Sequence, residues 1–417
     1  MRDVFIAGSS MTRFAKHLDR SIKDLVKEAV NGVLSDADIT PENIQAAWFS
    51  NSMWGYFTDQ HCIKGQVALR KLGIEGIPIT NVENACASAS TALHMAWMGV
   101  ASGMYDCVLA VGAEKLYDRD KLKTFKAYWA GIDVENMEEQ MAAWRNLVRG
   151  ITLDIPVEDD SAGAGASRSA FMDIYSGMAR RHMATHGTTQ RQLASIASKN
   201  HFHSTMNPFA QYQRDISIDE VLAGRIVTWP LTVPMCAPVG DGSAAAILCS
   251  ADFMKRLVSP RPVKILASVL GSGTSRMVSE EHMDIAVRLS GQAYEISGVG
   301  PLDIDVAEVH DATAFGELHQ TESLGFCQPG EGGPFGESGA TRIGGRIPIN
   351  TSGGLESRGH PVGASGLGQI YELVTQLRHE AGRRQVGDCR LALAENGGGN
   401  LGFEEAAMGI HILERVR

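Results

Sequence analysis

The stretch Val82-Glu83-Asn84-Ala85-Cys86-Ala87-Ser88-Ala89-Ser90 decides how this sequence is interpreted. The apolar run 77–82 predicts a strand, and residues 87–101, rich in Ala and Met, predict a buried helix. A cysteine between them lies beside the partial positive charge and the free N–H groups of a helix N-terminus. Such a position stabilises a thiolate and lowers the pKa of the thiol. We therefore predict that Cys86 is a nucleophile.

The elements around this stretch alternate between strands and helices. Strands are predicted over residues 3–8, 46–50 and 107–112, with an amphipathic helix over 21–34. Strands and helices do not alternate over residues 116–230. From about residue 262 the alternation returns, with a helix expected over 279–289. This order predicts an α/β fold with helices on both faces of a parallel or mixed sheet. The two similar halves suggest an internal duplication, on element order alone.

Composition limits the kinds of partner. The 417 residues carry a net charge of −10, so nucleic acid is not expected as a partner. No secretory leader and no membrane-spanning stretch is expected. Seven cysteines at irregular spacing do not resemble a disulfide framework, which favours a cytoplasmic location. The absence of a C-x-x-C pair predicts no metal site. All cysteines other than Cys86 are interpreted as structural: Cys62, Cys107, Cys236, Cys249, Cys327 and Cys389.

Two histidines are candidates for a partner to Cys86. His360 lies in the glycine-rich run Gly359-His360-Pro361-Val362-Gly363 just before a predicted helix, and an imidazole there could take the proton of a thiol. His310 and Asp311 follow a predicted strand, where active-site residues of α/β sheets usually lie. His310 could hydrogen-bond a thioester oxygen as charge develops on it. An ordinary surface His-Asp pair is the alternative.

The last glycine-rich segment is Glu395-Asn396-Gly397-Gly398-Gly399-Asn400. Consecutive glycines can present backbone N–H groups to an oxyanion, and they can equally form a tight hairpin between two strands. Both interpretations stay open from the sequence. The segment does not fit a phosphate-binding loop, because no helix clearly follows it.

These four segments occur in the order found in thiolases, and the chain resembles the lipid-transfer or sterol-carrier-protein branch of that superfamily. The resemblance also covers Pro234-Met235-Cys236-Ala237-Pro238 and is weakest over residues 116–160. It implies a thiolase fold: two duplicated βαβαβαββ halves in a five-layer αβαβα arrangement with an inserted loop domain. The implied domains are residues 1–115 plus 231–255 for the first half, 116–230 for the insertion, and 256–417 for the second half.

The resemblance also implies roles for particular residues. Cys86 would accept the acyl group, His360 would activate it, and His310 would belong to one oxyanion hole. The Cys86 backbone N–H and Gly399 would form the second. Coenzyme A would be a co-substrate, contacted by Ser352 and Gly353, with no covalently bound cofactor.

The chain departs from the family at the second catalytic cysteine. In the sterol-carrier branch that cysteine follows His-Asp, where Ala312 stands here, and in other branches it stands at about the place of Glu395. Three accounts remain open. Glu395, or another acid such as Glu317, does the proton transfer; the substrate needs no such group, as in a retro-aldol cleavage; or Cys86 only carries an acyl group. We favour Glu395, because burial can raise the pKa of a carboxyl group.

The resulting prediction is CoA-dependent thiolysis of a 3-oxoacyl-CoA, or the reverse Claisen condensation, through a Cys86 acyl-enzyme. The alternatives are a retro-aldolase of the steroid side-chain type, whose members generally lack the nucleophilic cysteine, and a non-catalytic acyl-CoA-binding subunit. A homodimer is implied, with a small zinc-ribbon and OB-fold partner in a heterotetramer as a further hypothesis.

The acyl substrate is suggested only by composition. Aromatic and basic residues could line a pocket for an aromatic or dicarboxylic acyl group such as benzoylsuccinyl-CoA, although packing or dimer contacts are the interpretation we favour for them. These residues are Trp54, Tyr56, Phe57, Trp129, Trp144, Arg145 and Arg149.

Overall fold

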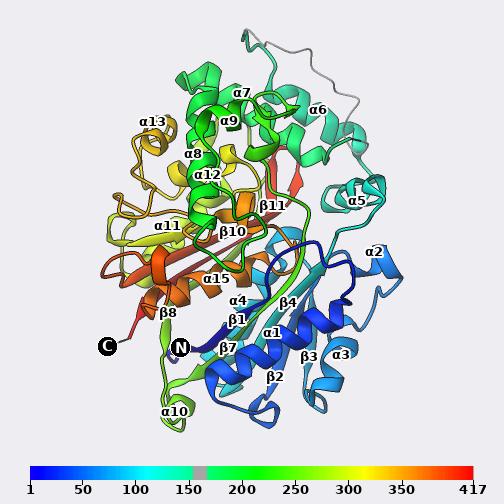
Figure 1. Cartoon of the computed structure of the whole chain (residues 1–417), viewed down its shortest axis with the longest axis vertical. Coiled ribbons are helices and arrows are strands. Elements are labelled where there is room, and N and C mark those ends of the chain that lie inside the picture. Colours follow the sequence, from blue (N-terminus) through cyan, green and yellow to red (C-terminus); the bar gives the residue numbers. More distant parts are fainter. Residues whose placement is uncertain (154–166, 417) are drawn as a thin grey trace.

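A nine-stranded mixed sheet forms the centre of the molecule in the computed structural model, which describes residues 1–153 and 167–416 (Figure 1). The strand order is β3-β2-β4-β7-β1-β8-β11-β10-β9. The strands are β1 (Val4–Met11), β2 (Ala46–Ser50), β3 (Ile79–Val82), β4 (Cys107–Lys115), β7 (Asp241–Ser250), β8 (Val263–Ser272), β9 (Val306–Glu308), β10 (Leu391–Leu401) and β11 (Glu404–Arg415).

The sheet contains the same strand pattern twice. In the first half β2 pairs parallel with β3 and β4, β4 pairs antiparallel with β7, and β7 with β1. In the second half β9 pairs parallel with β10, β10 antiparallel with β11, and β11 with β8. The counterpart of β3 is reduced to one parallel bridge between Ala307 and Ile349. The predicted duplication is therefore confirmed, and the halves join where β1 and β8 pair over Val4–Ile6.

Helices cover the sheet in layers. Helices α4 (Ser88–Ala101) and α15 (Ser365–Leu377) share one apolar core with strand residues of both halves. Helices α1 (Ile22–Ala37) and α3 (Lys64–Leu69) pack on the outer face of the first half, and α11 (Ile285–Ser297) on that of the second. This gives the order helix, sheet, helix, sheet, helix that the sequence predicted.

Capping residues explain where two of these helices begin. Ser21 and Asp24 form a capping box at the start of α1. Helix α11 starts later than the predicted 279–289, because Asp284 caps it by accepting the N–H of Ala286, and Glu404 accepts the N–H of Ile285. The residues before Asp284 form only a short 3₁₀ turn, Glu281–Met283.

The described helices between β4 and β7 lie toward one end of the sheet (Figure 1). Helix α7 (Ala170–His186) ends with Gly187 as its C-cap, and α8 (Gln190–Ser204) is capped by Thr189. Helix α8 packs against three helices of the second half: α12 (Ala314–Ser323), α13 (Gly332–Glu337) and α14 (Gly354–Arg358). The boundaries 116–230 for an inserted domain remain a prediction.

The remaining elements complete the described part of the chain. They are α2 (Trp54–Thr58), α5 (Lys121–Ala127), α6 (Met137–Leu147), α7 (Ala170–His186), α8 (Gln190–Ser204), α9 (Ile218–Leu222), α10 (Ala251–Met254) and a small hairpin of β5 (Ile226–Thr228) and β6 (Leu231–Thr232). Among the described residues, no helix combines the length and apolar character needed to cross a bilayer.

Candidate active site

A cavity of about 310 Å³ lies where the two halves meet the segment between β4 and β7. Cys86, His310 and His360 line it together with Gly398 and Gly399. The opposite wall is mainly aromatic and apolar, formed by Phe125, Tyr128, Phe171, Met172, Tyr175 and Pro238. Three exposed basic side chains, Lys16, Lys121 and Arg225, also line the cavity. The structure thus brings together the three residues that the sequence singled out for acyl transfer.

Cys86 lies in a tight turn that joins β3 to α4. The 3₁₀ turn Ala85–Ala87 precedes the helix, and Ala85 has a φ of 47°, which is a strained conformation for a residue with a side chain. The Ser88 hydroxyl accepts the N–H of Asn84 at 2.8 Å and donates to the carbonyl oxygen of Ala85 at 2.6 Å. These bonds hold the turn, so that the partly exposed sulfur of Cys86 faces the cavity.

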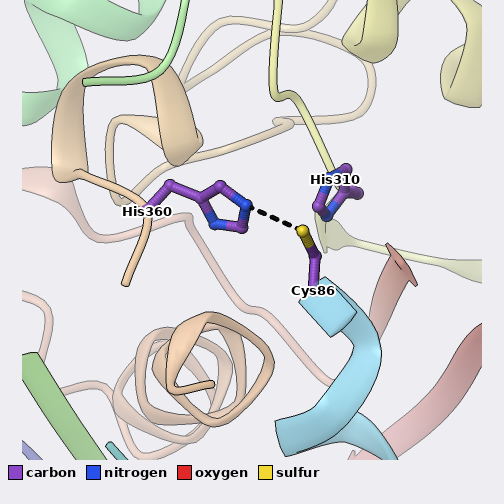
Figure 2. A group of neighbouring side chains, drawn as sticks. All are labelled: Cys86, His310 and His360. Atoms are coloured by element: carbon purple, nitrogen blue, oxygen red, sulfur yellow. Dashed lines mark hydrogen bonds between the residues drawn. The ribbon is translucent and has the colours of Figure 1, made fainter. Parts of the chain in front are cut away.

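His360 comes from the other half of the fold and faces that sulfur (Figure 2). Its Nε2 atom lies 3.3 Å from Cys86 Sγ, and its Nδ1 atom lies 2.7 Å from the hydroxyl of Ser365. Ser365 donates its own proton to the carbonyl oxygen of Pro361 at 3.0 Å, so it accepts from Nδ1–H of the imidazole. Nε2 is then unprotonated and positioned to take the thiol proton.

His310 follows β9, and its ring meets that of His360 edge-on, with centroids 5.2 Å apart. The Asn396 side-chain amide donates to His310 Nδ1 at 3.1 Å, which places the ring proton on Nε2. Burial lowers the pKa of His310 to about 4, so the ring is a neutral donor near pH 7. This state suits a hydrogen bond to an oxygen that gains negative charge.

The electrostatics of Cys86 differ from the prediction. Burial raises the pKa of its thiol to about 12, and the carboxyl groups of Glu405, Glu114 and Glu83 add to the rise, while a backbone hydrogen bond from Gly399 opposes it. Burial also moves the pKa of His360 well below its usual value, with the neighbouring His310 and Arg358 adding to the effect. The pair is therefore a neutral thiol beside a neutral imidazole, rather than the resident thiolate that the helix N-terminus suggested.

The glycine-rich segment forms the strand β10 itself, and the turn of the hairpin comes at Gly402 and Phe403. A Cβ on Gly398 would lie 2.2 Å from the backbone N of Ala87 and 2.8 Å from that of Cys86, so only glycine fits against the nucleophile turn. The segment therefore belongs to a hairpin, and its backbone also reaches the reactive sulfur, while its role as a donor to an oxyanion stays a prediction.

Two predicted acids lie outside the cavity wall. Glu395 is fully buried, and its Oε2 accepts the backbone N–H of His310 at 2.8 Å, so it fixes the histidine rather than facing a substrate. Burial raises the pKa of Glu395 to about 8. Glu317 is ion-paired with the buried Lys199 and accepts from Asn350 at 2.8 Å. Neither position supports the proton transfer that the sequence assigned to Glu395.

The residues predicted to contact coenzyme A are also in the interior. The backbone N–H and the hydroxyl of Ser352 donate to Glu308 at 3.0 and 2.6 Å, and Glu308 pairs with Arg358 at 3.1 Å. Gly353 packs against Ser204. The prediction of a coenzyme contact at Ser352 and Gly353 is corrected, because this polar cluster holds the loop before His360 and does not line the cavity.

None of the aromatic and basic residues suggested for the substrate pocket lines the cavity, which agrees with the packing interpretation. Trp144 stacks on Trp129 and donates its indole N–H to the carbonyl oxygen of Gly402. Conversely, Cys236, interpreted as structural, does line the cavity.

Sequence reasoning missed three residues that complete the site: Ser365, Asn396 and Glu405. The first two orient the histidines. Glu405, on β11, is a carboxyl group in the cavity wall. Its position follows from the register of the β10–β11 hairpin, in which Glu405 pairs with Asn400. No motif in the sequence marks it.

The same three side chains could also hold a metal ion. The donor atoms of Cys86, His310 and His360 lie within 4.8 Å of one another, and one sulfur with two imidazoles suits zinc. The hydrogen bonds already described favour the acyl-transfer arrangement, in which Nε2 of His360 is directed at sulfur.

Two family models match the chain. The model described as "Thiolase, N-terminal domain" matches residues 4–223, and "Thiolase C-terminal domain-like" matches residues 272–414.

Curated relatives are similar over most of the chain. An acetyl-CoA acetyltransferase of Methanothermobacter thermautotrophicus is 37% identical over 100% of both chains. Sterol carrier protein 2 of Bos taurus is 37% identical over 97% of this chain and 73% of its own length. The benzoylsuccinyl-CoA thiolase subunit BbsB of Thauera aromatica is 34% identical over 92% of this chain and 91% of its own.

Solved structures have the same fold. The Ltp2-ChsH2(DUF35) aldolase aligns with a TM-score of 0.77 and 25% identity, covering 100% of this chain and 98% of its own. Human mitochondrial 3-ketoacyl-CoA thiolase in complex with CoA aligns with a TM-score of 0.67 and 16% identity, covering 100% and 98%.

Proposed function

This chain belongs to the thiolase superfamily, in the branch of sterol carrier protein 2 and the non-specific lipid-transfer proteins, and from this premise we propose that it cleaves or forms the C–C bond of a 3-oxoacyl-CoA through an acyl-enzyme on Cys86. As a thiolase-family acyl-CoA acyltransferase it needs a nucleophile and a base. The observation that carries the proposal is the 3.3 Å contact between Cys86 Sγ and His360 Nε2 at the cavity wall.

The first half of the reaction uses the neutral pair. As Cys86 attacks the keto carbon of the substrate, its proton passes to His360 Nε2, which is the unprotonated nitrogen. Proton transfer in step with attack removes the need for a free thiolate, which the raised pKa of the thiol disfavours. The Ser365 hydroxyl stabilises the imidazolium through Nδ1–H.

Two sets of hydrogen-bond donors would stabilise the negative charge that develops on oxygen. The backbone N–H groups of Cys86 and Gly399 would contact the oxygen of the carbon bonded to sulfur. Nε2–H of His310 would contact the thioester oxygen of the leaving acyl-CoA. Because these groups are fixed by the turn, by β10 and by Asn396, they need little rearrangement when the charge forms.

Coenzyme A would enter past the exposed basic side chains of the cavity, Lys16, Lys121 and Arg225, whose charges attract its phosphates. The aromatic wall of Tyr128, Phe171 and Tyr175 would accept an aromatic or branched acyl group. Among candidate substrates we propose an aromatic dicarboxylic ester of the benzoylsuccinyl-CoA type, supported by the similarity to BbsB.

A partner chain is part of the proposal. The name of the Ltp2-ChsH2(DUF35) aldolase joins two components, which supports a partner for the present chain. We propose that the present chain forms a homodimer that binds a small zinc-ribbon and OB-fold protein. Co-purification of a small zinc protein with the tagged chain would support this; a chain fully active alone would contradict it.

The similarity to an aldolase favours a second candidate, retro-aldol cleavage without an acyl-enzyme. The two reactions differ in the product left on the protein. After incubation with acetoacetyl-CoA, thiolysis predicts an acetyl adduct on Cys86 in the intact mass, absent from Cys86→Ala. Release of an aldehyde or ketone from a 3-hydroxyacyl-CoA without any adduct would favour the aldolase. A panel of aromatic, dicarboxylic and steroid esters would then identify the acyl group.

A further inference from the structure

We propose that Glu405 is the second acid/base of this site, the group that gives a proton to, or takes one from, the substrate carbon beside the thioester. This inference rests on the proposed thiolase function. It fills the position left open by Ala312, which lines the cavity with a methyl group only.

The geometry of the hairpin puts the Glu405 carboxyl into the wall of the cavity with Cys86, His310 and Gly399. A Cβ on Gly397 would lie 2.4 Å from Oε1 and 2.6 Å from Cδ of Glu405, so the absence of a side chain at Gly397 leaves room for this carboxyl group. Among the carboxyl groups that raise the pKa of the Cys86 thiol, Glu405 has the largest effect, as expected for a residue of the same cavity wall.

The carboxyl group of Glu405 also makes no hydrogen bond to another described residue. Within the described residues, Asp118 and Glu405 are the two acids that line the cavity. Asp118 accepts the N–H of Asp120 at 2.9 Å and lies 3.8 Å from Lys123, whereas the Glu405 side chain has no hydrogen-bond partner in the described part of the chain. The half-buried Glu405 carboxyl group is therefore open to the cavity and free to contact a substrate there.

Cys236 is the competing candidate, because it lines the cavity. Its backbone also forms an isolated antiparallel β-bridge with Thr313, next to Ala312. The charged groups that act on its thiol are Glu356 and Arg225, not residues of the Cys86 cluster. Glu405, by contrast, acts on both Cys86 and Tyr175. These interactions favour Glu405 over Cys236 as the group that acts together with Cys86.

The environment of Glu405 favours the protonated form of its carboxyl group. Burial raises the pKa of its carboxyl well above the usual value, and the nearby acids Glu395, Asp284 and Glu404 add to the rise, against Arg276. A carboxyl group whose protonated form is favoured can donate a proton, as the cleavage direction requires.

The protons balance over a full cycle. When the C–C bond breaks, its electron pair passes to the carbon beside the thioester, and the Glu405 carboxylic acid protonates that carbon. Cys86 keeps the acyl group and His360 keeps the thiol proton. When coenzyme A attacks the acyl-enzyme, its thiol proton returns to the Glu405 carboxylate, and His360 returns its proton to the departing Cys86 sulfur.

The test separates acylation from C–C chemistry. With acetoacetyl-CoA and coenzyme A, Glu405→Gln should cleave at least about 100-fold more slowly than the unchanged protein. Incubated with acetyl-CoA, the same variant should still show the Cys86 adduct by intact mass. Gly397→Ala should also slow cleavage, because its methyl group displaces the carboxyl. Asp118→Asn and Cys236→Ala serve as comparisons and should stay within about tenfold of the unchanged protein.

Three results would overturn the assignment: near-normal cleavage by Glu405→Gln, loss of both acylation and cleavage in that variant, or loss of cleavage in Cys236→Ala with Glu405→Gln active. A failure of the proposed function itself looks different, since the unchanged protein would then form no Cys86 adduct.

Discussion

The sulfur of Cys86 and the Nε2 atom of His360 are 3.3 Å apart, although 274 positions separate the two residues along the chain. One comes from the turn before α4 and the other from the loop before α15, and these two helices pack together in the central layer. The contact is therefore a product of the duplication: each half contributes its central helix, and the reactive pair lies where those helices begin.

The first prediction concerns the protonation of this pair. Because the pKa of the Cys86 thiol is raised to about 12, its thiolate fraction should grow about tenfold per pH unit over the working range. Alkylation of Cys86 by iodoacetamide, followed by peptide mass spectrometry with the exposed Cys62 as internal reference, should thus accelerate from pH 6 to pH 9 without a plateau. A constant rate across this range would indicate a resident thiolate–imidazolium pair.

The second prediction concerns the tautomer of His360. Removing the hydroxyl with Ser365→Ala frees Nδ1, so the ring is no longer restricted to the form that accepts at Nε2. Acyl-enzyme formation should slow by about 10- to 100-fold, and its pH dependence should shift. Ser365→Thr, which keeps the hydroxyl, is the matched control. Equal loss in both variants, with an unchanged pH profile, would argue for a packing role alone.

The third prediction concerns His310 as a hydrogen-bond donor. His310→Ala removes the donor and should lower the rate of C–C cleavage by about 100- to 1,000-fold. His310→Asn should lose less, because an amide still donates a hydrogen bond. Cys86 acylation by acetyl-CoA should be less affected in both. Identical rates for the two variants would remove the donor role.

The fourth prediction concerns the buried ion pair of Glu308 and Arg358, which lie 3.1 Å apart, each fully enclosed. Arg358→Met leaves the Glu308 carboxylate without a counter-charge and should lower the free energy of unfolding by about 3–5 kcal/mol, measured by urea denaturation. The double variant Glu308→Gln/Arg358→Met should recover part of this loss. A double variant as unstable as the sum of the single ones would show that the pair is not coupled.

The fifth prediction uses zinc as a probe of the three donor atoms. Since Cys86, His310 and His360 place their ligand atoms within 4.8 Å, added Zn²⁺ should inhibit the enzyme reversibly, and a chelator should restore activity without lowering that of the untreated protein. Prior acylation of Cys86 should protect against the metal. If the activity of the isolated chain, measured without the proposed zinc-ribbon partner, fell on chelation, the chain itself would hold a functional metal.

The central framework and the reactive pair followed from sequence because each has a strong local signal. The order of strands and helices predicted the duplication, and the small residues after Cys86 and the glycines around His360 marked both members of the pair. Glu395 and Ser352 were assigned by position in a motif, and a motif does not say on which side of a strand or loop a side chain lies. Here hydrogen bonds to His310 and Glu308 turn both into the interior.

The remaining residues depend on long-range register. Glu405 reaches the cavity only because β10 and β11 pair with Glu405 opposite Asn400, and because Gly397 leaves space for its carboxyl. The protonation of Cys86 likewise depends on its enclosure by segments distant in sequence, which outweighs the helix N-terminus. Neither effect is encoded by neighbouring residues.

The pairing of β1 with β8 has a consequence for any attempt to divide the protein. Only three residue pairs join β1 to β8 in the described part of the chain. The apolar core around α4 and α15, by contrast, contains residues of both halves. A gene split in the exposed stretch near Val258 would give one fragment with the sulfur and another with both imidazoles, each chemically inert alone. Activity would return only when the fragments recombine, so catalysis itself reports the reassembly of the two halves.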